Sequence, residues 1–176
     1  MPDGRDDVNT DQVGARILEA ALHLLRSGGP RAVTMQAVTA STGIAKTTIY
    51  RRHQDRRALL TAALEHLVQQ PQLDPDAPRD QRLQWAIRQS VDVIAHGIGV
   101  GGFAALLTDE DPDFTDVFRT ILVAYREQAV AALGPDAADG ETVVDMIVGS
   151  YIAEFARTGG IRKDWSERVF ALLRVN

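Results

Sequence analysis

Residues 34–57 read TMQAVTASTGIAKTTIYRRHQDRR, and this stretch decides the fold predicted for the chain. Thr34 can cap the start of a helix over residues 35–42. Gly43 stops that helix, because glycine accepts the left-handed backbone of a helix-ending turn at little cost. A second short helix can then cover residues 46–53. Two short helices joined by a glycine turn predict a helix-turn-helix, whose second helix enters the major groove of DNA.

The second of these helices carries side chains suited to nucleic acid. Ile49 can face inward, while hydroxyl, phenol and basic groups project toward a partner: Lys46, Thr47, Thr48, Tyr50 and Arg51. Such groups bond to phosphates or base edges, and basic side chains supply the phosphate attraction that dominates affinity. Residues 41–57 hold five basic side chains and one acidic one, a balance of +4. A solvated helix face would explain the charge alone, but charge with this turn and helix favours DNA contact.

The composition describes an ordinary globular protein. The chain has 176 residues, of which 45% are hydrophobic and 24% charged, enough for one large or two small domains. Cysteine is absent, which excludes disulfides and thiol catalysis and fits a reducing cytosol. We find no apolar run of membrane-spanning length, and the acidic start MPDGRDDVNTD is unlike a signal peptide. We therefore expect a cytoplasmic protein with no membrane partner.

Charge is divided unevenly along the chain. Residues 1–70 hold nine basic and seven acidic side chains, a balance of +2, whereas residues 71–176 hold ten basic and seventeen acidic ones, a balance of −7. Because DNA repels an acidic surface, contact with DNA should fall to the basic N-terminal part.

The apolar spacing predicts helices throughout and no strand of useful length, so the fold class is all-α. Residues 1–10 are expected to be a mobile tail, and residues 11–57 a three-helix DNA-binding head that contains the helix-turn-helix. A linking helix with Asp55 as its N-cap continues to about residue 70. A proline-broken loop then opens a helical body over residues 71–176. Its helices are expected over 80–96, 103–108, 114–133, 142–157 and 165–175.

Two short motifs in the body suggest chemistry that their context does not support. The glycine cluster 97–102 lacks the strand and full spacing of a dinucleotide site. The acidic turn 109–113 lacks the glycine and terminal glutamate of an EF-hand, which favours a solvated loop. The four histidines are scattered, and no serine stands in a nucleophile elbow. We therefore expect neither cofactor nor metal nor enzyme activity.

An ungapped series of short motifs runs from about Asp11 to Leu67: RILEAA at 16–21, Gly28-Gly29, Thr34-Met35, Val38, GIAKTTIY at 43–50 and DRRALL at 55–60. With these motifs, this third of the chain resembles the DNA-binding region of the TetR family of bacterial transcriptional regulators.

The resemblance implies roles for individual residues in binding a palindromic DNA operator. Lys46, Thr47 and Thr48 would approach base edges or adjacent phosphates. Tyr50, Arg51 and His53 would hold phosphates, and Thr34 and Arg56 would hold the backbone from the starts of their helices. It also implies a homodimeric repressor whose body takes up a small apolar or amphipathic effector, which shifts the spacing of the two heads.

The body supplies candidates for a dimer interface and for an effector pocket. The last two expected helices keep more apolar surface than one small body needs, so they could pair as a four-helix bundle or simply complete the monomer core. Their interface residues would be Val143, Ile147, Ser150, Phe155, Trp165, Val169, Phe170 and Leu173. The pocket residues, each of which could equally be plain core, would be Trp85, His96, Phe103, Phe118, Tyr125, Met146 and Tyr151. The alternative function is a DNA-binding regulator without an effector, whose body only dimerises or recruits a protein partner.

Overall fold

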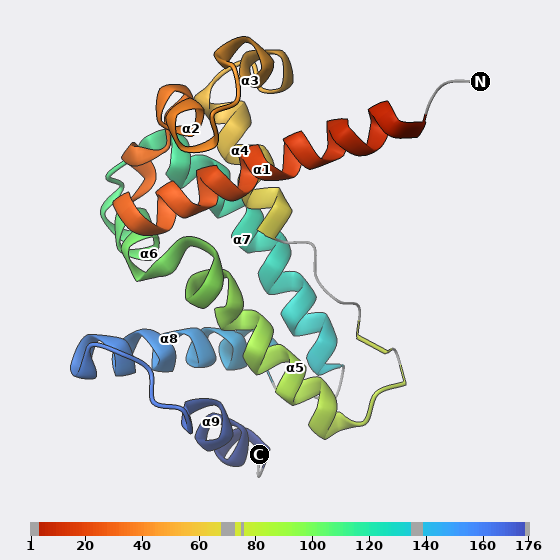
Figure 1. Cartoon of the computed structure of the whole chain (residues 1–176). Coiled ribbons are helices and arrows are strands. Elements are labelled where there is room, and N and C mark those ends of the chain that lie inside the picture. Colours follow the sequence, from red (N-terminus) through yellow and green to blue (C-terminus); the bar gives the residue numbers. More distant parts are fainter. Residues whose placement is uncertain (1–3, 68–72, 75, 135–138, 175–176) are drawn as a thin grey trace. The chain divides into compact units, whose positions relative to one another are not determined.

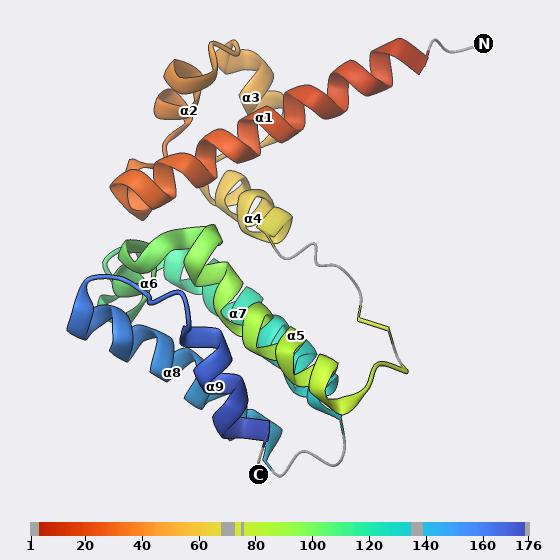
Figure 2. The same cartoon turned by 60° about the horizontal axis from the view of Figure 1, so that its bottom comes forward.

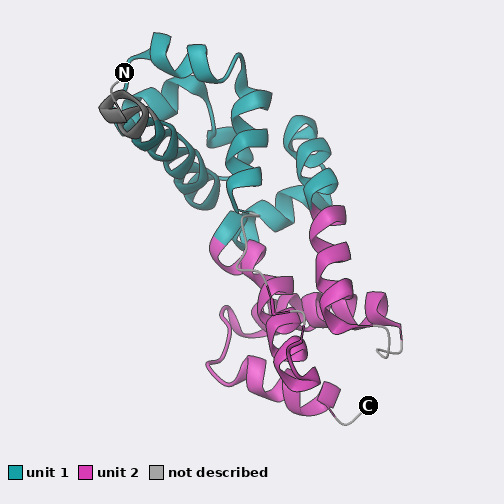
Figure 3. Ribbon diagram, turned by 90° about the vertical axis from the view of Figure 1, so that its right-hand side faces the viewer, with its two compact units in different colours: residues 1–69, 97–121 teal, residues 70–96, 122–176 magenta. Residues whose placement is uncertain are grey.

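The computed structural model describes residues 4–67, 73–74, 76–134 and 139–174, with side chains from residue 11 onward. Every regular element within these ranges is a helix, which confirms the all-α prediction. The chain forms two compact units, residues 1–69 with 97–121 and residues 70–96 with 122–176 (Figure 3).

The first unit contains the helix-turn-helix (Figures 1 and 2). Its elements are α1 (Gly4–Gly28), the 3₁₀ turn η1 (Pro30–Ala32), α2 (Met35–Thr42), α3 (Lys46–Arg52), α4 (Arg56–Leu67), α6 (Gly99–Thr108) and the part of α7 (Pro112–Leu133) up to Ile121. Helix α1 packs against α2, α4 and α6, and α2 packs against α3. The apolar spacing of these helices places one side of each in a shared core that includes Ile17, Leu25, Val38, Ile49, Leu59 and Leu64.

The second unit is a smaller helical body. It consists of α5 (Arg79–Asp92), part of the π-helical turn η2 (Val93–Ile98), the remainder of α7, α8 (Gly140–Thr158) and α9 (Trp165–Arg174). Helix α5 packs against both α8 and α9. Ile87, Tyr125, Ile147 and Trp165 are among the buried residues of this unit, and the rings of Tyr151 and Trp165 meet edge to face at 5.3 Å.

Three expectations from the sequence differ from the structure. Residues 4–10, expected in a mobile tail, are the first turns of α1. Residues 97–121, expected in the body, pack in the same unit as the helix-turn-helix. The glycine cluster 97–102, expected to interrupt the helices, is itself helical. The packing of Gly102 accounts for one of these glycines, because a Cβ there would lie 2.9 Å from the Cβ of Ile98.

One helical stretch contains a longer apolar segment than we expected from the sequence, in which we found no apolar run of membrane-spanning length. The helical stretch Arg79–Thr108 contains an 18-residue segment that is apolar enough by composition to cross a membrane. Inside the structure 44% of that segment is buried. A core helix has the same composition, so one such segment is weak ground for a membrane protein.

A buried carboxylate joins α8 to α9. Glu154 is 4% exposed, and its oxygens accept hydrogen bonds from the amide of Arg162 at 3.0 Å and from the guanidinium of Arg168 at 2.5 Å. These hydrogen bonds, first from Arg168 and then from the Arg162 amide, hold the pKa of Glu154 at about 2, below its ordinary value of 4.5. Glu154 therefore favours the folded state wherever it is ionised.

Acid should destabilise the protein partly through this residue. Because the folded-state pKa is lowered, the stabilisation is complete above about pH 5 and is lost as the pH falls toward 2. We expect Glu154→Gln to be less stable than the wild type at pH 7 and to lose less stability on acidification. Urea unfolding at pH 7, 4 and 3 measures both effects. The exposed Glu167→Gln on α9 is the control, and identical pH dependence for the two variants would contradict the role of Glu154.

Candidate nucleic-acid interface

The helix-turn-helix is defined by its caps. The Thr34 hydroxyl accepts a hydrogen bond from the amide of Ala37 at 3.0 Å and so caps α2. Gly43 ends α2 with a φ of 71°, the left-handed conformation that the sequence predicted, and its amide donates to Thr39 O at 2.9 Å. Both ends of α2 are therefore set by local sequence.

Helix α3 turns its polar side outward. Ile49 is fully buried, whereas Lys46, Thr47, Tyr50 and Arg51 are exposed and Thr48 is half-buried. The ammonium of Lys46 lies 5.5 Å from the centre of the Tyr50 ring, a cation–π distance. The helix thus presents hydroxyls, a phenol and cations on one surface, as its expected role in the major groove requires.

Two arginines lie where the helix-turn-helix meets α1. Arg16 donates through Nη2 to the carbonyl of Thr42 at 3.0 Å, which places a cation at the C-terminal end of α2, where the helix dipole favours it. From α3, Arg52 Nη1 reaches within 3.4 Å of the point that a Cβ on Gly14 would occupy. Neither arginine was assigned a role from the sequence.

His53 differs from a cationic phosphate ligand. Burial, and after it the neighbouring charge of Arg52, lowers the pKa of His53 below 6.5. Burial and Arg52 thus favour the neutral ring, so His53 is less suited than an arginine to offer a phosphate a positive charge.

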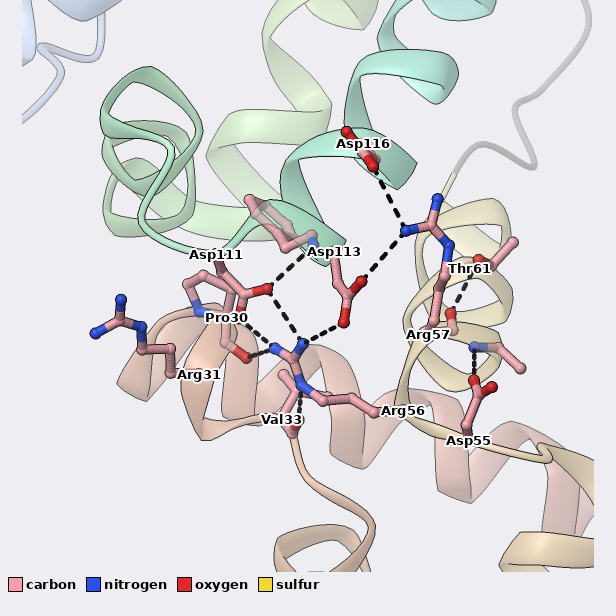
Figure 4. Close-up of polar contacts among 12 residues, drawn as sticks. Pro30, Arg31, Val33, Asp55, Arg56, Arg57, Thr61, Asp111, Asp113 and Asp116 are labelled. Atoms are coloured by element: carbon pink, nitrogen blue, oxygen red, sulfur yellow. Dashed lines mark hydrogen bonds and ion pairs between the residues drawn. The ribbon is translucent and has the colours of Figure 1, made fainter.

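Arg56 is directed into the protein, not toward a DNA backbone (Figure 4). Its Nε donates to Val33 O at 2.8 Å and its Nη2 to Pro30 O at 2.7 Å. The same guanidinium pairs with both carboxylate oxygens of Asp111. The expectation that Arg56 holds a phosphate does not fit this geometry, because all three nitrogens already have partners within the chain.

In the acidic turn 109–113 only Asp111 is buried, and the other four residues are exposed, as expected for a solvated loop. The side chain of Asp111 is 9% exposed, and Arg31 donates to the carbonyl of Glu110 at 2.6 Å. Arg57 lies 3.3 Å from Asp113 and 3.6 Å from Asp116 (Figure 4). Carboxylates of this turn and of the α7 start therefore pair with Arg56 and Arg57, and the backbone of the turn binds Arg31. These pairs join residues more than fifty positions apart, so they could not be predicted from a local sequence motif.

The expected pocket residues are divided between the two compact units. Phe118 is fully buried and stacks on Phe114 at 5.4 Å in the first unit, which also holds Phe103. His96 and Met146 are exposed on the single chain. Trp85, Tyr125 and Tyr151 lie within the second unit.

The second unit has two cavities whose lining residues the structure describes. None of the seven expected pocket residues is among these lining residues. One, of about 280 Å³, lies between α5 and α9 and is lined by Gln84, Ile87, Arg88, Ser166, Glu167 and Phe170. The other, of about 320 Å³, lies between α8 and α9 beside Glu154. Among the residues that the structure describes, no three His, Cys, Asp or Glu side chains gather as a metal site would need.

The expected interface residues separate into two groups. Ile147 and Trp165 are buried within the chain and belong to its own core, which corrects their assignment to an outer surface. The other six are half-buried: Val143, Ser150, Phe155, Val169, Phe170 and Leu173. Two apolar residues that the sequence analysis did not include are far more exposed on these helices, namely Met146 at 54% and Leu172 at 64%.

Comparison with known proteins agrees with this geometry. Residues 17–63 match the family described as bacterial regulatory proteins, tetR family. A crystal structure of a TetR transcriptional regulator from Rhodococcus sp. RHA1 is similar in fold, with a TM-score of 0.51 and 21% sequence identity over 97% of this chain and 98% of that one. The comparison with curated protein sequences gives no match.

The capped α2, the glycine turn and the polar surface of α3 make the chain a helix-turn-helix DNA-binding protein. Residues 17–63 are thus similar to the DNA-binding region of the TetR family of bacterial transcriptional regulators, as the resemblance of the first third predicted.

Proposed function

We propose that the chain is a homodimeric repressor in the bacterial cytoplasm, which leaves a palindromic operator when a small effector binds its body. The observation that supports the proposal is that one chain has two different exposed surfaces, one polar and basic and the other apolar. Helix α3 presents Lys46, Thr47 and Arg51, and helices α8 and α9 present apolar side chains to solvent.

A second copy of the chain is the partner that best suits α8 and α9. A single recognition helix reads few base pairs, so useful specificity needs two heads about 34–36 Å apart on successive major grooves. Met146 and Leu172, together with the six half-buried residues of these helices, form an apolar surface that a two-fold contact would bury. The sequence-based proposal of a four-helix bundle is supported by this exposure.

An effector site in the body is supported by two unsatisfied donors on α5. Arg82 Nε and Trp85 Nε1 are buried and have no hydrogen-bond partner among the described residues. They lie one helical turn apart, and burying an unpaired donor costs about 1–3 kcal/mol. An amphipathic molecule with a carbonyl or carboxylate oxygen would supply the missing acceptor.

Effector control requires that the molecule bind the DNA-free form more tightly than the DNA-bound form. A thermal-shift screen of small amphipathic carboxylates and amides, followed by titration against the DNA complex, tests this requirement. A compound that stabilises the protein and releases DNA supports the repressor. Binding without release, or no binding across the screen, favours the alternative regulator whose body only dimerises or recruits a protein.

Base reading by α3 is tested by Thr48→Ala. We expect the ratio of affinities for a selected duplex over a scrambled duplex to fall about tenfold or more, because a base contact is worth about 1–3 kcal/mol. Arg51→Ala is the matched control, since it should weaken both duplexes alike and flatten the salt dependence by about 0.9 per head. Fluorescence titrations at two salt concentrations measure both quantities. Equal losses on the two duplexes for Thr48→Ala would remove it from base reading.

A further inference from the structure

We propose that Asp111 is a positioning residue for DNA reading, which acts through Arg56 on the segment that starts the helix-turn-helix. The inference depends on the DNA-binding activity alone, and neither a dimer nor an effector is needed for it.

Asp111 performs two tasks with one carboxylate. Its Oδ1 accepts the amide of Phe114 at 3.1 Å, which caps the start of α7, and accepts Arg56 Nη1 at 3.1 Å. Its Oδ2 accepts Arg56 Nη2 at 2.5 Å. Burial alone would raise the pKa of Asp111, but the hydrogen bonds from Arg56 and Phe114 outweigh it and keep the carboxyl ionised. The pair is thus a charged, two-pronged contact.

The other edge of the Arg56 guanidinium holds the backbone before α2. Its acceptors there, Pro30 O and Val33 O, lie at the start and just beyond the end of η1. Val33 immediately precedes Thr34, the N-cap of α2. Because the guanidinium is planar and rigid, one side chain fixes two carbonyls and a carboxylate in a single arrangement (Figure 4).

This arrangement joins three helix starts within the first unit. Arg56 is the first residue of α4, Asp111 caps α7, and the two carbonyls lead into α2. Helix α3 lies between α2 and α4 in the chain, so the entry of α2 and the start of α4 together fix its direction. Loss of the carboxylate charge should therefore misplace α3. The affinity for a specific DNA sequence should then fall more than the affinity for non-specific DNA.

The substitution Asp111→Asn isolates this effect. Asparagine is a good N-cap and keeps an oxygen for the Phe114 amide, but it removes the charge and one acceptor of Arg56. Glu110→Gln is the matched control, because it removes one negative charge from the same turn at a side chain that is 47% exposed. Both variants should bind a scrambled duplex slightly better than the wild type, since each removes one charge that repels phosphate.

The measurement is the affinity for a duplex selected by the wild-type chain from a random pool, divided by the affinity for its scrambled counterpart. This ratio is independent of the fraction of active protein, so partial unfolding does not imitate the effect. We expect Asp111→Asn to lower the ratio about tenfold or more and Glu110→Gln to leave it unchanged. Arg56→Lys, which keeps the charge but loses the fork, should reproduce the loss, and the double variant should be no worse than either alone.

Two results would overturn the proposal. One is an equal ratio for Asp111→Asn and Glu110→Gln, with Arg56→Lys also at the wild-type value. The other is a salt dependence that flattens by about 0.9 in Arg56→Ala, which would make Arg56 a phosphate contact after all.

Discussion

Leu172→Glu is expected to yield a folded monomer that has lost its affinity for a palindromic duplex. Leu172 is 64% exposed on α9, so a charge there costs the single chain little. In a two-fold contact through α8 and α9 the same charge would be buried without a partner, which is strongly unfavourable. Loss of the second head should weaken binding to a two-site duplex by about 10²-fold or more, whereas binding to a single half-site stays the same.

Sedimentation at micromolar concentration and titration of both duplexes measure these two effects. Leu107→Glu provides the control, because Leu107 is 69% exposed on α6 and outside the proposed interface. It should leave both the oligomeric state and DNA affinity close to those of the wild type. A Leu172→Glu chain that still sediments as a dimer would place the interface elsewhere.

Ile49→Ala is expected to unfold the DNA-binding head under conditions where the wild type is folded. Ile49 is the fully buried residue of α3, and large-to-small changes of this kind cost about 2–5 kcal/mol. That is a large share of the 5–15 kcal/mol by which proteins are usually stable. Affinity should fall for every duplex, since the loss concerns the folded state of the head and not a base contact.

Graded substitutions test this explanation. Ile49→Val removes a single methylene and should cost about 0.5–1.5 kcal/mol, with DNA binding retained. Val123→Ala on the exposed side of α7, where the side chain is 59% accessible, should be nearly neutral. Urea unfolding followed by circular dichroism orders the three variants. A loss for Ile49→Ala no larger than that for Ile49→Val would mean that α3 contributes little to the core.

The parts of the fold that local chemistry decides could be predicted from the sequence. Gly43 ends α2 in the left-handed conformation, and Asp55 caps the next helix by accepting the amide of Ala58 at 2.8 Å. Both signals lie within four residues of the helix end they set. The core positions of α1 and α4 follow in the same way from helical spacing.

What could not be predicted depends on pairs far apart in the chain. Arg56 and Asp111 are separated by 55 positions, and nothing near either residue shows that they meet. Glu154 and Arg168 are 14 positions apart across a loop. The position of Glu154 among the apolar residues of α8 indicates burial. The sequence alone does not show which arginine pairs with this carboxylate. The exposure of Met146 on α8 could not be predicted for a related reason. An apolar side chain can face a core, a pocket or a partner, and the sequence does not distinguish these surroundings.

The carboxylates at residues 110–116 have a consequence for how this regulator would tolerate osmotic stress. They occupy Arg56 and Arg57 within the chain, so a head has fewer cations to exchange for the potassium ions that surround DNA. Occupancy of a site changes with ionic strength in proportion to the number of ions exchanged. A cell that loses water and concentrates its salts would therefore displace this protein less readily than a regulator whose head is basic throughout.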